Sequence, residues 1–327
     1  MLKNILLFIV FSIFSINQKL LYSAELREWG AVTMDNDLFV GNDSGYTSGI
    51  YFSYFEGSDG ADFEPAWLTR LLQWKHDNDS LIYHYNVTTF GQVMVTPSDI
   101  TIEIPQNDDV PYSGLLFIQQ SNIKVFSDYS DKVSALIGVL GPYSKAEQSQ
   151  KIVHELIDSD IPQGWDYQLK DELVFQVSRG RVWRGWYSSD NNTDILFGAD
   201  AKLGTLESSL TAGMMIRYGI NIEKTYSTAM LSNDRSSNPI NIDSGWYVYA
   251  SISAAYIANI IYLDGNTFKD SPSVDYDPLQ ADLHVGLAYA WKNFSIAVVR
   301  NNLNWVHQDD GYADIREYGS ITFLWRM

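Results

Sequence analysis

The chain of 327 residues contains no cysteine, which excludes disulfide bonds and thiolate metal sites and fits an exported protein. Basic residues are scarce, because 22 Lys and Arg stand against 40 Asp and Glu, and the formal net charge of -18 would repel nucleic acid. Beyond the amino-terminal segment no apolar run of about 18 residues occurs, which excludes a transmembrane helix. An acidic chain can still meet a phosphate-rich surface through divalent cations.

The amino-terminal segment has the pattern of a secretory signal peptide. Lys3 precedes an apolar run over residues 5–14, and the small residues Ser23 and Ala24 follow at its end. We therefore expect residues 1–24 to be a signal peptide and residues 25–327 to form one domain in the bacterial outer membrane.

Aromatic residues and alternating hydrophobicity are what the chain has in abundance. The 21 Tyr and 10 Trp suit the girdles of a membrane barrel. Residues 210–218 place apolar side chains at even positions and Thr, Gly, Met and Arg at odd positions, and residues 281–291 show the same period of two. A soluble sandwich would also alternate, but an aromatic-ended apolar face opposite a face of charge and glycine is what surrounding lipid and a polar lumen require.

The alternation predicts an all-β fold, a twelve-stranded antiparallel transmembrane β-barrel with short helical segments in the outer connections. An even number of strands suits a closed single-chain barrel with both termini in the periplasm. The last strand alternates to the terminus, as in outer-membrane barrels, although it finishes Trp325-Arg326-Met327 rather than on an aromatic residue. The expected strands are 27–37, 46–55, 81–96, 113–127, 132–140, 168–180, 193–204, 208–221, 245–263, 278–291, 294–306 and 316–327.

Polar motifs concentrate in the first three connections that open at the outer rim. The first holds Asp35-Asn36-Asp37 and the start of the next strand, the second runs over residues 96–114, and the third over residues 141–160. Taken alone, the Asp-Asn-Asp run also fits a turn beside glycine.

The third connection contains a histidine in a stretch compatible with a helix. Glu147, Gln150, His154 and Asp158 would share one face, while four apolar residues would form a side that rests against the protein. A lone histidine of this kind is more often a solvated surface residue. A catalytic interpretation of His154 therefore depends on the neighbouring motifs. The four apolar residues are Ile152, Val153, Leu156 and Ile157.

Three segments together resemble the lipid A 3'-O-deacylase family of outer-membrane barrels. They read MDNDLFVGNDSGYTSGI from residue 34, TPSDI with DDVPYSG from residue 96, and GVLGPYSKAEQSQKIVHELI followed by GWDYQL from residue 138. The resemblance implies a site at the outer-leaflet end that uses a histidine and Ca²⁺ to hydrolyse an acyl ester of lipid A, the substrate partner. The expected state is a monomer among outer-membrane lipids, without nucleic acid.

Carried over by motif position, the resemblance implies three sets of site residues. His154, Asn36 and Gln150 would be catalytic, Asp37, Thr47 and Asp160 would bind the metal, and Tyr46 and Tyr112 would contact substrate. Asp160 stands where the family has a longer Glu, and a lysine of the family pattern has no counterpart around residues 100–105.

The residues also favour ester hydrolysis on chemical grounds. Histidine exchanges protons near neutral pH, and a hard cation held by oxygen ligands can stabilise an oxyanion. The chain has no G-x-S-x-G elbow and no H-E-x-x-H zinc motif. The alternative is a non-catalytic barrel, either a narrow pore or a surface-binding protein, and a pore predicts rings of charge along the lumen.

Overall fold

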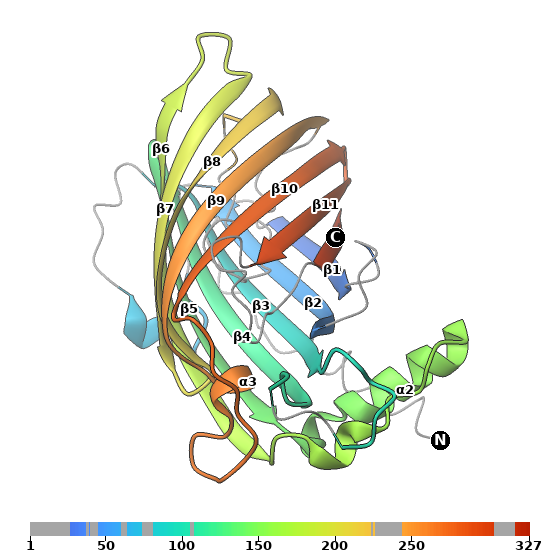
Figure 1. Cartoon of the computed structure of the whole chain (residues 1–327). Coiled ribbons are helices and arrows are strands. Elements are labelled where there is room, and N and C mark those ends of the chain that lie inside the picture. The colour runs from blue at the N-terminus through green and yellow to red at the C-terminus, as the bar shows by residue number, and fades with distance from the viewer. Residues whose placement is uncertain are drawn as a thin grey trace.

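The structure, a computed structural model, describes residues 27–36, 39, 45–59, 64–73, 81–104, 108–223, 225, 244–303 and 318–327. The expected signal peptide therefore lies outside the described residues. Twelve antiparallel strands form a closed barrel, because β1 pairs with β12 as well as with β2 (Figure 1). This confirms the predicted fold class. The strands are β1 (Arg27–Asn36), β2 (Gly45–Asp59), β3 (Leu81–Thr96), β4 (Ser113–Phe126), β5 (Tyr129–Leu140), β6 (Glu172–Tyr187), β7 (Thr193–Gly204), β8 (Glu207–Ile220), β9 (Ser244–Ile260), β10 (Leu279–Trp291), β11 (Phe294–Leu303) and β12 (Tyr318–Arg326).

Five predicted strand boundaries were wrong by three residues or more. The second strand continues to Asp59 rather than ending at residue 55, and the fifth begins at Tyr129 rather than at residue 132. The sixth strand ends at Tyr187 rather than at residue 180, because β6 continues to pair with β7 as far as Tyr187, which lies opposite Asp194. Its start moves to Glu172, since residues before it are held by a bond from the Leu169 amide to the Tyr112 carbonyl. The ninth strand stops at Ile260, whose amide donates to the Asp264 carboxylate at 2.6 Å and so begins a helical turn.

The connections after odd-numbered strands open at one end of the barrel, which we call the helical end. It carries η4 (Pro142–Ser144), α2 (Ala146–Ile157), η5 (Gly164–Tyr167) and α3 (Ile261–Asp264). The opposite end, the terminal end, holds the start of β1, the finish of β12 and the connection with the short helix η2 (Arg70–Leu72). Among the described residues no helix is long and apolar enough to cross a membrane.

The two faces of the sheet follow the predicted alternation. On β8, Leu210 is 65% exposed, and Met214 and Ile216 are exposed with it, whereas Thr211 and Arg217 are buried. Val285 and Leu287 on β10 face outward in the same way, opposite the buried His284. The outer wall is therefore apolar over most strands, as lipid contact requires.

The lumen is packed, and it is less polar than predicted. One cluster near the helical end joins Tyr51, Phe117 and Leu140 with the α3 residues Ile261 and Leu263. A second cluster fills the remainder and includes Trp29, Phe55, Tyr85, Met215 and Tyr249. Inward-facing aromatic rings fill a barrel of this size because they reach across it. A packed lumen also argues against the pore alternative.

Arg217 is the most buried charge in the lumen, with no exposed surface. Its guanidinium donates to both carboxylate oxygens of Asp194, at 2.9 and 2.6 Å, and to the Thr225 hydroxyl at 2.7 Å. Arg184 makes a second ion pair to Asp194 at 3.3 Å, and the Tyr247 ring lies 5.3 Å from the Arg217 guanidinium carbon. The network ties β6, β7, β8 and β9 together near the terminal end.

We expect Arg217→Met to lower barrel stability by up to about 3 to 5 kcal/mol, because the buried Asp194 carboxylate loses both hydrogen bonds to Arg217 and keeps only the longer ion pair to Arg184. The measurement is the temperature at which the folded band disappears when samples are heated to a series of temperatures before electrophoresis. The double variant Arg217→Met, Asp194→Asn should regain part of the loss. A double variant that is no more stable than the single one would contradict an electrostatic origin.

Candidate functional site

The helix α2 is positioned by an unusual backbone run before it. Gly141 has φ of 91° and Lys145, the residue before the helix, adopts the left-handed conformation with φ of 64°. Pro142 opens the short helix η4 between them. The helix ends at Asp158, again left-handed with φ of 57°, whose amide donates to the His154 carbonyl. His154 is thereby fixed in the last turn.

A close approach holds the start of α2 against the outer face of β4. A Cβ at Gly114 would lie 2.3 Å from the Ala146 Cβ and 2.3 Å from the Ser144 Oγ, so the position requires glycine. The Gly141 amide donates to the Gly114 carbonyl at 2.8 Å, and the Gln92 side chain donates to the Ser144 carbonyl at 2.7 Å. The helix therefore packs on the outside of β3 and β4.

A small buried cluster orients Gln150. Trp165 of η5 packs against Tyr112 with the rings tilted by 55° and 5.0 Å between ring centroids, and Met94 and Ala146 complete the cluster. The Trp165 indole donates to the Gln150 Oε1 at 2.8 Å. The Gln150 Nε2 is buried and has no hydrogen-bond partner within the described part of the chain. An oriented amide donor without a partner can serve a ligand.

His154 lies one turn beyond Gln150 and is partly exposed. Its Nδ1 lies 2.6 Å from the backbone carbonyl of Asp160. A carbonyl only accepts, so Nδ1 carries the proton and the neutral ring keeps its lone pair on Nε2. The carbonyl thus selects the tautomer that a general base needs. Asp160 reaches His154 through its backbone and not through its carboxylate.

The expected resting place of the apolar side of α2 was wrong. Ile152, Val153, Leu156 and Ile157 are all exposed, with Leu156 at 80%, whereas the helix buries Ala146 and Gln150. The reason is that Trp165 and Gly114 draw the Ala146–Gln150 side onto the barrel. The apolar side of α2 is left exposed, as in a helix that lies in a membrane interface.

Asn36 closes β1 at the helical end and also belongs to the outer face. Its neighbour Asp35 is buried in the lumen, while Met34, which shares the Asn36 side of the strand, is 47% exposed. Asn36 pairs with Ser48 across β2, and a bulge displaces the ladder between Tyr46 and Ser48. Asn36 and α2 therefore lie on the same outer face of four successive strands, β1 to β4.

The predicted metal ligands are only partly described. Asp37 lies outside the described residues, and so do the side chains of Tyr46 and Thr47, although the backbone puts Thr47 next to the Ser48 partner of Asn36. Within the described ranges no three acidic or histidine residues cluster to hold a metal. Of the oxygen-bearing residues expected near this strand end, Asn36 is the one whose place the structure describes, and an amide oxygen is a ligand type that suits Ca²⁺.

Tyr112 occupies a different place from the predicted substrate contact. It has no exposed surface, and burial raises the pKa of its hydroxyl to about 12. The hydroxyl donates weakly to the Ile100 carbonyl at 3.4 Å, and the ring supports Trp165. Tyr112 is thus buried beneath Trp165, the residue that donates to Gln150.

The other described histidines hold structural positions. His84 on β3 lies 2.7 Å from the Asn122 amide, and His284 on β10 lies 2.6 Å from the Asn301 amide oxygen. Both are buried. His76 and His307 lie outside the described residues. The residue that sequence reasoning missed is Trp165, although a lone tryptophan in the polar stretch GWDYQL was a signal for a buried anchor.

The comparisons with known proteins follow the same direction. The family model described as outer membrane protein LpxR matches residues 5–327. LpxR from Salmonella typhimurium matches with a TM-score of 0.72 and 15% identity, over 91% of this chain and 99% of that chain. The beta domain of the Bordetella autotransporter Brka matches with a TM-score of 0.44 and 8% identity, over 92% and 98%. The translocator domain of autotransporter NalP from Neisseria meningitidis matches with a TM-score of 0.43 and 7% identity, over 100% and 95%. No curated protein sequence matches the chain.

We expect Trp165→Phe to loosen α2 without affecting the barrel, because it removes the indole donor and leaves the buried Gln150 amide without its partner, at a cost of about 1 to 3 kcal/mol. Hydrogen exchange should accelerate in residues 146–157 while the unfolding temperature of the barrel stays unchanged. The matched control is Trp186→Phe, an exposed tryptophan on β6. Equal exchange in α2 for both variants would show that the indole bond does not hold the helix.

Proposed function

Because the chain belongs to the LpxR family of outer-membrane lipid A deacylases, we propose that it hydrolyses the 3'-O-linked acyl ester of lipid A in the outer leaflet, with His154 as general base and Ca²⁺ as the cofactor. The observation that carries the proposal is the tautomer of His154. A backbone carbonyl holds the Nδ1 proton and leaves Nε2 ready to accept one, on a helix attached to the outer face of the barrel.

The reaction follows from these groups. The Nε2 of His154 takes a proton from water, and the hydroxide oxygen attacks the ester carbonyl to give a tetrahedral oxyanion. The Gln150 Nε2, held in place by the Trp165 indole, donates a hydrogen bond to that oxyanion. As the carbon–oxygen ester bond breaks, His154 returns the proton to the departing sugar oxygen. The products are a fatty acid and lipid A with a free hydroxyl.

The metal site would lie across the strand end from this base. The three predicted ligands, Asp37, Thr47 and Asp160, would hold the ion through oxygen atoms, and the Asn36 amide would offer a further oxygen. Bound Ca²⁺ would supply positive charge at the ester carbonyl. Asn36 belongs to the same outer face as α2, so its amide can orient the attacking water, and Tyr46 beside the bulge is the remaining substrate contact.

The exposed apolar side of α2 explains how a lipid reaches the base. Ile152, Val153 and Leu156 are exposed within two residues of His154. If the helical end faces the cell exterior, this side of the helix lies in the outer leaflet, where acyl chains of lipid A can pack against it. Substrate then enters sideways from the membrane, and no passage through the packed lumen is needed.

We expect His154→Ala to reduce ester cleavage by about 10²- to 10⁴-fold, the usual contribution of a general base. His154→Gln should fail equally, because an amide does not take up the proton. The assay is mass spectrometry of lipid A incubated with purified protein. The matched control on the same helix is Glu155→Gln, an exposed residue that should keep wild-type activity.

Wild-type turnover in His154→Ala would support the non-catalytic reading of the barrel. Both His154 variants should fold, because the residue lies outside the sheet, and unheated gels provide that check.

We also expect activity to require Ca²⁺ and to disappear with a chelator. Asp37→Ala should weaken calcium binding measured by calorimetry, since it removes a carboxylate ligand. Asp160→Ala separates two roles, because the backbone carbonyl that holds His154 survives the substitution. Weakened binding in Asp160→Ala would assign its carboxylate to the metal, and unchanged binding would limit Asp160 to orienting His154. Full activity in chelator would remove the metal from the mechanism.

A further inference from the structure

The connection between β2 and β3 folds back over the outer face of the barrel. Its described part, residues 64–73, contains η2, and we call it the strap. Figure 1 shows it in light blue outside the barrel wall. At the end that holds both termini, barrels of this class usually have short turns. Here residues 60–80 separate the two strands, which gives the chain the length to return along the wall.

Two amide side chains on the outer wall, which we call the polar pair, hold the strap. Asn86 of β3 and Gln120 of β4 accept hydrogen bonds from the backbone amides of Ala66 and Leu68, both at 3.1 Å. The Asn86 side chain also donates to the Glu64 carbonyl at 2.8 Å. Three hydrogen bonds therefore join the strap backbone to two neighbouring strands.

The polar pair lies on the side of the sheet that faces lipid. Phe90, on the same side of β3 as Asn86, is exposed, whereas Tyr85 and Val87 on the other side belong to the buried cluster of the lumen. Ile82, near the start of β3, is exposed as well. Exposed apolar side chains thus lie on both sides of Asn86 along the strand. The strap is therefore attached within the lipid-facing wall.

The strap satisfies several of its own polar groups. The Thr69 amide and hydroxyl both donate to the Ala66 carbonyl at 3.0 Å. The Leu72 amide and the Gln73 side chain donate to the Thr69 carbonyl, at 3.0 and 3.2 Å. Irregular backbone beside lipid needs such partners, because no water is there to replace them. Together with the bonds to the polar pair, they suit the strap to a place against the membrane.

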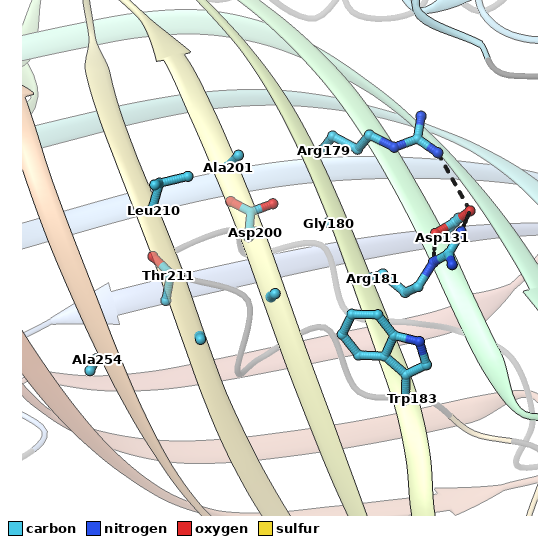
Figure 2. A pocket seen from close by; sticks show the side chains of 12 residues that line it. Asp131, Arg179, Gly180, Arg181, Trp183, Asp200, Ala201, Leu210, Thr211 and Ala254 are labelled. Atoms are coloured by element: carbon cyan, nitrogen blue, oxygen red, sulfur yellow. Dashed lines mark hydrogen bonds and ion pairs between the residues drawn. The ribbon is translucent and has the colours of Figure 1, made fainter.

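Another polar group on the outer wall is satisfied without a covering segment. The Arg181 guanidinium of β6 donates to both carboxylate oxygens of Asp131 on β5, at 2.6 and 2.8 Å (Figure 2). These two side chains serve each other across neighbouring strands. The polar pair instead gives an oxygen atom of each side chain to the strap backbone. The contacts of the polar pair therefore make the strap a fixed part of the wall.

The outer side of the strap combines apolar and charged side chains. Trp67 is 68% exposed and Leu71 is 94% exposed. Arg70 and Glu64 are exposed too, and they form an ion pair at 2.6 Å. An exposed tryptophan and leucine beside paired charges are typical of a segment at the boundary between hydrocarbon and headgroups.

We propose that the strap is an interfacial anchor, with Trp67 and Leu71 inserted among the acyl chains of the leaflet at the terminal end. Membrane lipid is the partner of this surface because the apolar residues Phe90 and Ile82 of the adjoining wall already face lipid. The polar pair fixes the strap backbone to the barrel and so keeps the two apolar side chains turned outward. The anchor does not depend on ester hydrolysis.

Nitroxide labelling of the purified protein in vesicles of phosphatidylethanolamine and phosphatidylglycerol tests the proposal. Because the chain contains no cysteine, Leu71→Cys carries a single label. We expect this label to collide more often with oxygen, which dissolves in hydrocarbon, than with a water-soluble nickel chelate. The lipid reference is Leu210→Cys on the wall, and the water reference is Ser189→Cys in the exposed turn between β6 and β7.

The references give each outcome a meaning. A label at residue 71 that behaves as the label at residue 210 does would support the anchor. Collisions like those at residue 189 would place the strap in water and overturn the proposal. A label shielded from both reagents would overturn it as well, because a protein surface such as a second copy would then cover the strap.

Gln120→Leu tests the attachment, because it removes the acceptor of the Leu68 amide. In the labelled Leu71→Cys background the strap should detach about fivefold more often, the usual effect of one hydrogen bond, and the label should become more mobile. The matched control is Gln119→Leu, which removes a neighbouring amide on the lumen side of β4. The folded band on gels confirms that both variants assemble. Equal label mobility in the two variants would overturn the role of the polar pair.

Discussion

The closing pair of strands is the constraint on which the rest of the structure depends. In lipid every backbone group of a strand needs a partner, and β1 finds its partners in both β2 and β12, from Trp29 opposite Arg326 to Asn36 opposite Gly319. Closure fixes the rotation of each strand about its axis, and so it decides which of the two alternating sets of side chains faces lipid. Asn36 faces outward because Asp35, one residue earlier, faces the lumen. The position of the site follows from that parity.

The outer face is an effective place for chemistry on a membrane lipid. The lumen is filled by aromatic rings and by the Arg217 network, so it offers no path. On the outer face, the start of α2 packs against β3 and β4, His154 lies in its last turn, and its apolar side is exposed. A base on a helix attached to this face would meet esters that are already in the membrane, so the proposed substrate would not need to leave it.

The sequence predicted the fold well because a strand in lipid has one side that must be apolar, and a period of two is easy to read. The strand expected at residues 208–221, for example, lies at Glu207–Ile220, and its prediction needed no tertiary information. The site was predicted only as a set of residues. That Gln150 would be buried against Trp165, and that the carbonyl of Asp160 would hold His154, depends on how two short helices fold back onto β3 and β4. Helical periodicity also gave the wrong buried side of α2, because Ala146 beside Gly114 outweighs four larger residues when close approach is what fixes the helix.

Polar residues on the outer wall differ in what their position costs. Asn36 and the groups around α2 lie at the helical end, where water and headgroups solvate them, so a hydrolytic site is inexpensive to keep there. Asp131 and Arg181 lie on the outer side of β5 and β6, away from the helical end, and there the charges are paired. Arg181 donates to both carboxylate oxygens of Asp131, at 2.6 and 2.8 Å, and this two-point contact lowers the cost of keeping either charge on the wall.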